Sequence, residues 1–227
     1  MVSNKTTDKP ANNSQRALMQ LRQMIFAGDL PAGSDHLESE LAQHLDMSRT
    51  PVREAILMLE GQGLLEMRPR KGVRILPLSP DDMAEIYDVL TELESLAAEQ
   101  AASFGYSEQD LQGLADAIND MDKAILVPDL DTWADADDRF HKELVRLGGN
   151  SRVREIVARM SDQVRRARAT TLTLRPLPTK SNEDHRKVYQ AIKNGDANAA
   201  RETHRAHRRY AKHILVEILR KHRLRFV

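Results

Sequence analysis

A carboxylate and an imidazole that could share one metal ion occur at Asp137 and His141. The two residues are four positions apart in a stretch with helical patterning. On a helix this spacing places both side chains on one face, as two ligands of one ion require. Asp135 and Asp138 lie beside them, and such an acidic patch could also be a surface that water simply solvates. The pair alone leaves both interpretations open.

Two arginines, Arg49 and Arg53, have the same spacing and could contact DNA. A guanidinium can form two hydrogen bonds to the guanine edge in the major groove, or it can hold a phosphate. Ser48 and Thr50 are beside them and could add phosphate contacts. One exposed arginine on a helix is commonly only solvated, but two arginines together with Ser48 and Thr50 at the front of one helix favour nucleic-acid binding.

The overall charge of the chain does not indicate a nucleic-acid partner, because Lys plus Arg and Asp plus Glu both number 34. The segment 49–74 differs from this average, with six basic residues and three acidic ones. A local basic patch can attract DNA where the net charge does not.

Composition limits the remaining possibilities. The chain has no cysteine, so disulfides and thiolate metal sites are excluded and a metal ion must rely on His and carboxylate ligands. Aromatic residues make up only 4%, which favours helices packed through aliphatic side chains. No apolar run is long enough to cross a membrane, and the polar N-terminus has no secretory pattern. We therefore expect a mainly α, cytoplasmic protein with no membrane partner.

The first part of the chain predicts a winged helix-turn-helix at residues 14–77, after a disordered tail at residues 1–13. Apolar residues recur at helical spacing in 17–27 and 38–45, and a third helix follows Ser48, a favourable N-cap residue. Two short β-prone runs, 64–68 and 73–76, flank the basic turn 69–72 and predict a hairpin. A recognition helix that enters the major groove by its N-terminal residues has this arrangement.

The second part predicts an all-α antiparallel bundle at residues 81–222. Pro77 and Pro80 bracket a short connector, where we place the domain boundary. Short breaks rich in Gly and Pro separate the helical stretches, and such short loops join antiparallel neighbours. The expected helices are 81–104, 107–126, 130–147, 151–173, 182–194 and 196–222.

The N-terminal part resembles the GntR superfamily of transcriptional regulators. The segments that carry the resemblance are GDLPAG at 28–33, LESELA at 37–42 and MSRTPVREA at 47–55. The resemblance implies that Arg49, Thr50 and Arg53 contact an operator. It also implies that the wing turn Arg70-Lys71-Gly72 reaches the minor groove. Some relatives have an arginine where this chain has Ser39.

The C-terminal part resembles the FadR-type ligand-binding domain (FCD). The resemblance rests on DDRFHKEL at 137–144, Gly149-Asn150, EDH at 183–185 and RAH at 205–207. Metal-binding members of that domain use one Asp and three His, and the matching positions are Asp137, His141, His185 and His207. Such a ligand set suits Zn²⁺, Ni²⁺ or a similar divalent ion and leaves coordination positions open to a carboxylate. His204, one turn from His207, is expected to be an ordinary packing or surface residue.

The resemblance also implies a small organic acid as effector. Many relatives anchor it through an arginine in the first helix of this domain, but the matching residue here is Leu90. Another cation is then required, and Arg165, Arg166 and Arg168 are candidates, although they could equally be solvated charges.

The leading functional prediction is a ligand-responsive transcription regulator, expected to be a repressor, that binds a pseudo-palindromic operator as a homodimer. One alternative is a helical His/Asp metalloenzyme that acts on a small acid, since an open metal can activate water. That reading assigns no role to residues 49–72. The other alternative is an architectural DNA-binding protein without an effector, which would make the four matched ligands accidental.

Overall fold

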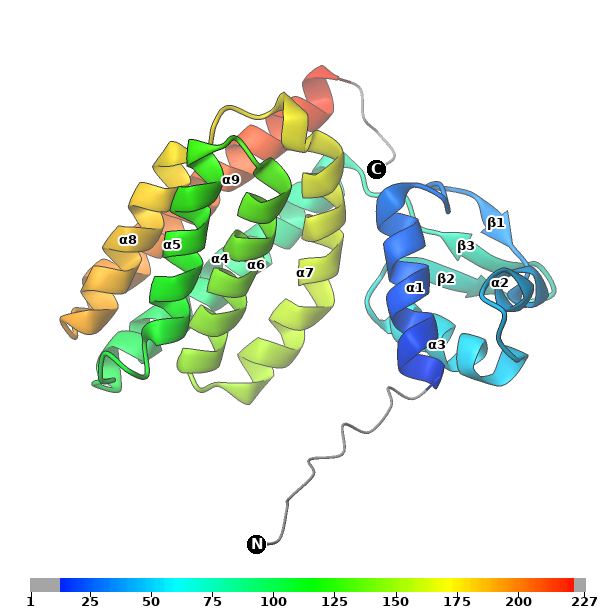
Figure 1. Ribbon diagram of the computed structural model, residues 1–227, viewed down its shortest axis with the longest axis horizontal. Coiled ribbons are helices and arrows are strands. Elements are labelled where there is room, and N and C mark those ends of the chain that lie inside the picture. Colours follow the sequence, from blue (N-terminus) through cyan, green and yellow to red (C-terminus); the bar gives the residue numbers. More distant parts are fainter. Residues whose placement is uncertain (1–12, 223–227) are drawn as a thin grey trace, which may run out of the picture. The chain divides into compact units, whose positions relative to one another are not determined.

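The computed structural model describes residues 13–222, and the chain forms two compact units that divide between Leu76 and Pro77. The protein is mainly helical, with one small antiparallel sheet in the first unit (Figure 1). The tail expected at residues 1–13 lies outside the described residues, apart from Asn13, which begins the first helix. Among the described residues, no helix combines the length and apolar character needed to span a membrane.

The first unit is a three-helix core with a sheet. The bounds of its elements are α1 (Asn13–Ala27), β1 (Asp35–His36), α2 (Glu38–His44), α3 (Arg49–Gly61), β2 (Leu65–Arg68) and β3 (Gly72–Ile75). The sheet has the order β1-β3-β2 and all its pairings are antiparallel. The core is apolar and includes Leu21, Val52, Ile56, Leu59 and Ile75. The helix-turn-helix and the hairpin expected from the sequence are both present.

The hairpin of β2 and β3 is held against the short strand β1, which the sequence analysis did not predict. The pairing register joins Leu65 to Ile75 and Arg68 to Gly72. Gly72 has a φ of 86°, and a Cβ there would lie 2.2 Å from the backbone oxygen of His36. Only glycine allows this approach of β3 to β1. β1 contains two polar residues and therefore gives no alternating apolar pattern.

The second unit is the expected bundle of six helices. Their bounds are α4 (Pro80–Ser103), α5 (Gln112–Leu126), α6 (Leu130–Leu147), α7 (Ser151–Thr171), α8 (Thr179–Lys193) and α9 (Ala197–Lys221), with a 3₁₀ turn η1 (Leu172–Leu174) after α7. The helix expected at 107–126 begins five residues later. Asp110 accepts hydrogen bonds from the backbone N–H and the hydroxyl of Ser107, and this fixes a turn there instead.

A polar layer separates two apolar clusters inside the second unit. One cluster joins α5, α6 and α8 and is represented by Leu114, Phe140 and Val188. The other joins α4, α7 and α9 and includes Leu90 and Leu215. The two longest helices, α4 and α9, contribute to both clusters, and buried polar residues occupy the segments between: Thr91, Glu94 and Ser95 on α4, and His204, His207 and Arg208 on α9.

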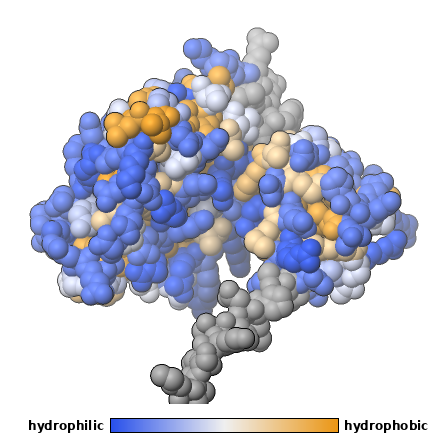
Figure 2. Space-filling model, viewed as in Figure 1, coloured by the Kyte–Doolittle hydropathy of each residue, from blue (hydrophilic) through white to orange (hydrophobic). Residues whose placement is uncertain are grey.

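The face of the molecule seen in Figure 2 is mainly hydrophilic. An apolar patch lies near the end of the helical unit that carries the loop between α5 and α6 (Figures 1 and 2). Leu126, the last residue of α5, and Val127, which follows it, are 81% and 72% exposed. In this unit the polar residues of α4 and α9 named above are buried, whereas a few large apolar residues are exposed.

Candidate DNA-binding surface and metal centre

The first turns of α3 present the residues that the sequence singled out for DNA. Ser48 is the N-cap of α3, although its side chain makes no capping hydrogen bond. Ser48, Arg49, Thr50 and Arg53 are all exposed. Val52, Ala55, Ile56 and Leu59 on the opposite face are buried in the core, and this packing fixes which side of α3 faces outward.

A surface groove brings the start of α3 together with the wing. Arg49 and Arg53 line it on one side, and Arg70 and Gly72 line it on the other. Lys71 is exposed beside them at the tip of the hairpin. Arg53 Nη1 lies 3.5 Å from Glu38 Oε2, and its side chain is 61% exposed. The residues predicted from two separate motifs therefore border one surface.

Two further residues of this groove are informative. Arg68 lines it and was not singled out from the sequence, although it lies in the basic segment; its Nη1 is 3.1 Å from Asp35 Oδ1. Ser39 also lines the groove, at the place where some relatives have an arginine. The groove is thus basic through α3 and the hairpin, with no added cation from α2 among the residues that line it.

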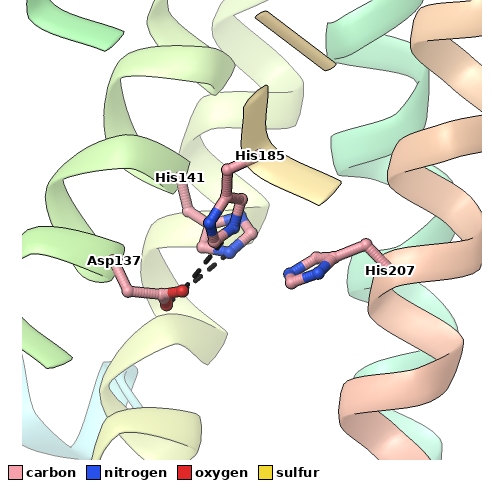
Figure 3. Close-up of side chains that lie close together, drawn as sticks. All are labelled: Asp137, His141, His185 and His207. Carbon is pink, nitrogen blue, oxygen red and sulfur yellow. Dashed lines mark ion pairs between the residues drawn. The ribbon is translucent and has the colours of Figure 1, made fainter. Parts of the chain in front are cut away.

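The four predicted metal ligands come together inside the second unit. Asp137 and His141 are on α6, His185 is on α8 and His207 is on α9. One ligand atom from each lies within 4.8 Å of the others, and all four residues are buried. Figure 3 shows the carboxylate and the three imidazoles directed toward a common centre from helices far apart in sequence. We call these four residues the DH3 cluster.

Asp137 is the residue that joins the DH3 cluster most closely. Its Oδ2 lies 3.7 Å from His141 Nε2, and its Oδ1 lies 3.6 Å from His185 Nε2 (Figure 3). The rings of His185 and His207 have centroids 4.5 Å apart. Burial opposes ionisation of Asp137, but the charge of Arg168 favours it, and the pKa is lowered. Asp137 is therefore an ionised carboxylate.

His185 provides the test of whether this cluster fits a metal ion. The side chain is fully buried, yet neither ring nitrogen has a hydrogen-bond partner among residues 13–222. Buried polar atoms in folded proteins are almost always paired. Burial lowers the pKa of His185 well below its usual value, so the ring is neutral and carries a free lone pair. A neutral imidazole is the form that binds a divalent ion, and the residues present fit one.

A second group of buried residues adjoins the cluster, and the sequence analysis missed it. Glu94 on α4 has its Oε2 3.0 Å from His141 Nδ1 and 3.4 Å from His204 Nε2. His204, expected to be a packing or surface residue, is fully buried in this polar group and is therefore not a surface residue. Ser95 Oγ lies 3.2 Å from His204 Nδ1. His141 thus faces Asp137 with one nitrogen and Glu94 with the other.

The three candidate arginines of α7 have different surroundings. Arg168 is buried and its Nη1 lies 2.7 Å from Asp137 Oδ2. Arg165 is on the exposed side, with its Nη2 2.9 Å from Asp135 Oδ1. Arg166 is buried and does not line the cavity next to the DH3 cluster, and neither does Arg165. Of the three, only Arg168 borders that cavity.

Comparison with known proteins agrees with both parts of the molecule. Residues 13–75 match the model described as bacterial regulatory proteins, gntR family, and residues 85–210 match the FCD domain model. A helix-turn-helix with a wing, followed by a helical bundle that matches the FCD model, defines a bacterial transcription regulator. The chain belongs to the GntR family of transcriptional regulators and carries an FCD domain.

Several relatives are similar over much of the chain. An HTH-type transcriptional regulator of Bacillus subtilis, YdhC, is 30% identical over 92% of this chain and 96% of its own length. A protein of Paenarthrobacter nicotinovorans described as a probable D-xylose utilization operon transcriptional repressor is 30% identical over 78% of this chain and 76% of its own length. The gluconate operon transcriptional repressor of Bacillus subtilis is 28% identical over 64% of this chain and 59% of its own length.

Solved structures share the fold. McbR/YncC of E. coli superposes with a TM-score of 0.77 at 20% identity, covering 92% of this chain and 99% of the other. A GntR regulator of Rhodococcus sp. RHA1 gives a TM-score of 0.72 at 22% identity, covering 90% and 97%. Because the family and the similar proteins are transcriptional regulators, this protein is a DNA-binding regulator and not a metalloenzyme.

Proposed function

We propose that this protein is a homodimeric repressor of a pseudo-palindromic operator. Its affinity for the operator changes when a small organic acid binds at a divalent metal ion in the helical unit. The metal would be held by Asp137, His141, His185 and His207. The observation that carries the proposal is His185, a fully buried neutral imidazole whose two nitrogens have no hydrogen-bond partner in the described part of the chain. The protein would act in the cytoplasm.

The DNA-binding role rests on the exposed basic groove. Arg49 and Arg53 would read base edges or phosphates in the major groove, Ser48 and Thr50 would bind phosphate, and the tip Arg70-Lys71-Gly72 would reach the minor groove. Repressor function is supported by the relatives that are described as repressors of the D-xylose utilization and gluconate operons.

The metal role rests on the donor set and its surroundings. The ion would supply an electrophilic centre with positions open to a carboxylate. Glu94 would accept a hydrogen bond from His141 Nδ1 and so leave Nε2 free as the ligand atom, the arrangement in which an outer carboxylate orients a coordinating imidazole. Arg168 would hold the carboxylate of Asp137 in place from the other side.

The DNA-binding part of the proposal is tested by anisotropy titrations with a duplex that the wild-type protein selects from random-sequence DNA. Arg49→Ala and Arg53→Ala are expected to weaken binding by about 1–3 kcal/mol each and to relax base preference, if each side chain reads a base. Arg152→Ala removes an exposed arginine of the helical unit and is the matched control. Equal affinities of the wild type and both α3 variants would contradict the assignment.

The sensing part is tested with the same duplex and a panel of short-chain mono- and dicarboxylates and sugar acids. At least one acid is expected to change the affinity of the metal-loaded protein for the duplex, and to have no such effect on protein stripped of metal by a chelator and then dialysed. Identical acid responses of loaded and stripped protein would remove the metal from the mechanism. Light scattering checks the dimer, and a monomer both free and on DNA would contradict it.

A further inference from the structure

A cavity opens beside the DH3 cluster, and its wall contains residues that the sequence did not assign to the effector. The cavity has a volume of about 60 Å³. Asp137, His141 and His207 of the cluster form part of the wall. Apolar side chains form much of the rest: Tyr87, Leu130, Trp133, Leu172, Leu177 and Ile214. A ligand here would have the cluster at one side and an apolar surface around it.

Four cationic side chains line this cavity, and three of them are already paired with carboxylates of the protein. The three pairs are Arg168 with Asp137 at 2.7 Å, Arg208 with Glu94 at 3.1 Å and Lys180 with Asp184 at 2.7 Å. Each of these positive charges is neutralised within the fold. They are therefore poor candidates for the group that attracts an anionic ligand.

Arg175 is the fourth cation and differs from the others. Its Nε and Nη2 both donate to Thr171 Oγ1, at 3.1 and 3.0 Å, which is a neutral hydroxyl. No carboxylate of residues 13–222 forms an ion pair with its guanidinium. Burial lowers the pKa of Arg175 to about 10, and the charge of Asp137 opposes this shift only in part, so the group stays charged at neutral pH without a directly paired counter-ion.

The backbone around Arg175 holds it at the cavity. Arg175 follows the 3₁₀ turn η1 and precedes Pro176-Leu177-Pro178, from which α8 starts. The two prolines fix their φ angles and limit the motion of this connection. The guanidinium is therefore a positioned donor and not a freely moving surface charge.

We infer that Arg175 binds the carboxylate of the effector, and that the effector is a small organic acid whose apolar part packs against Trp133 and Leu172. This inference deepens the proposed function and rests on it. A guanidinium presents parallel N–H donors that match the two oxygens of a carboxylate, which a lysine cannot reproduce. Arg175 would take the place of the first-helix arginine, whose position here is Leu90, a fully buried apolar residue.

The molecule contains its own reporter for this binding. Trp133 is the single tryptophan of the chain and lines the same cavity. Fluorescence titrations would use butanoate, hexanoate, succinate and gluconate, with butanamide and hexanamide as neutral counterparts. Each titration would be run on metal-loaded protein and on protein stripped by chelation and dialysed, so that no polycarboxylate chelator remains.

The variants are Arg175→Met, Arg175→Lys and Arg165→Met. Arg175→Met is expected to weaken carboxylate binding at least about tenfold, since a hydrogen bond to a charged group is lost, and to leave amide binding unchanged. Arg175→Lys keeps the charge but lacks the planar guanidinium with its parallel N–H donors. Its affinity for carboxylates should lie between those of Arg175→Met and the wild type. Arg165→Met removes an arginine of α7 outside the cavity and should bind as the wild type does. Circular dichroism and melting temperature check that each variant is folded.

The Arg175 variants and the removal of metal together distinguish failure of this inference from failure of the proposed function. Carboxylate binding that survives in Arg175→Met but disappears on metal removal overturns the role of Arg175 and leaves the metal sensor intact. Binding that is lost in Arg175→Met but unaffected by metal removal supports Arg175 and overturns the metal as the acid-binding group. Absence of any fluorescence or melting response of the wild type to these acids at millimolar concentrations overturns the inference.

Discussion

The two units of this protein place their polar residues in opposite ways. In the first unit Ser14 is the one buried polar side chain among the described residues, and the functional arginines are on the surface. In the second unit carboxylates, imidazoles and guanidinium groups are buried between two apolar clusters. Burying such groups costs free energy unless they are paired, so this polar layer is weak evidence of a contribution to stability.

This contrast separates the effects expected from mutation. Changes at the surface of the first unit should alter DNA affinity and leave the free energy of unfolding almost unchanged. Changes in the polar layer of the second unit should alter both ligand binding and stability. Trp133 and all four tyrosines, Tyr87, Tyr106, Tyr189 and Tyr210, belong to the second unit, so their fluorescence follows its unfolding separately.

The largest expected effect is that of Arg168→Met. The variant leaves the buried carboxylate of Asp137 without the guanidinium 2.7 Å away, and breaking a buried ion pair in this way costs about 3–5 kcal/mol. Urea unfolding of metal-free protein followed by Trp133 fluorescence measures it. Arg165→Met, on the exposed side of α7, should cost less than about 1 kcal/mol. Similar losses in the free energy of unfolding for the two variants would mean that the buried ion pair contributes no more to stability than the exposed one.

Acid pH should destabilise the second unit through its buried imidazoles. Burial lowers the pKa of His185, His204 and His207, in the case of His204 to about 3. Unfolded histidines take up protons near pH 6.5 and the folded ones only at lower pH, so protons favour the unfolded chain in this range. Stability of metal-free protein should fall from pH 6.5 toward pH 5, by up to about 1.4 kcal/mol per pH unit for each histidine.

Urea unfolding at a series of pH values measures this slope. His204→Asn should flatten it, while His213→Asn, which changes an exposed histidine of α9, should leave it unchanged. Stability that does not change between pH 6.5 and pH 5 would show that these imidazoles are not held neutral by burial.

Much of this arrangement could be predicted from the sequence. The parts that could not be predicted have one physical reason in common. The helices followed from apolar periodicity, and the pairing of Asp137 with His141 followed from their spacing on one helix. His185 and His207 required the family pattern, because they are on other helices. Glu94 gave no signal, since its approach to His141 depends on how α4 packs across the bundle. Arg175 lies in a connection, where no periodicity reports the direction of a side chain.

Glu94→Gln tests the missed residue and should have a smaller effect. The amide keeps the size of the side chain but removes the charge beside His141 Nδ1, and loss of such an outer partner typically lowers metal affinity about 10–100-fold. Competition titration with a coloured chelator measures the affinity. Glu92→Gln, on the same helix but away from the cluster, is the control. Equal metal affinities of wild type and Glu94→Gln would show that Glu94 does not support the metal ligands, and would leave its ion pair with Arg208 as its role.

The smallest expected effect is that of Lys71→Ala at the tip of the wing. If Lys71 binds a phosphate, its removal should weaken binding to all sequences uniformly and reduce the slope of log affinity against log salt by about 1. Anisotropy titrations at several salt concentrations measure the slope, with unfolding curves as the check on stability. An unchanged slope would remove Lys71 from the DNA contacts.

The central claim is that the buried cluster of the second unit holds a metal ion, and thermal melting with elemental analysis tests it most directly. Wild-type protein should contain about one divalent ion per chain, and an ion at 100 times its dissociation constant adds about 2.7 kcal/mol to stability, so chelation should lower the melting temperature. His185→Ala should lack the ion and show no response to chelator, whereas His213→Ala should behave as the wild type does. Wild-type protein without stoichiometric metal, melting identically with and without chelator, would contradict the account.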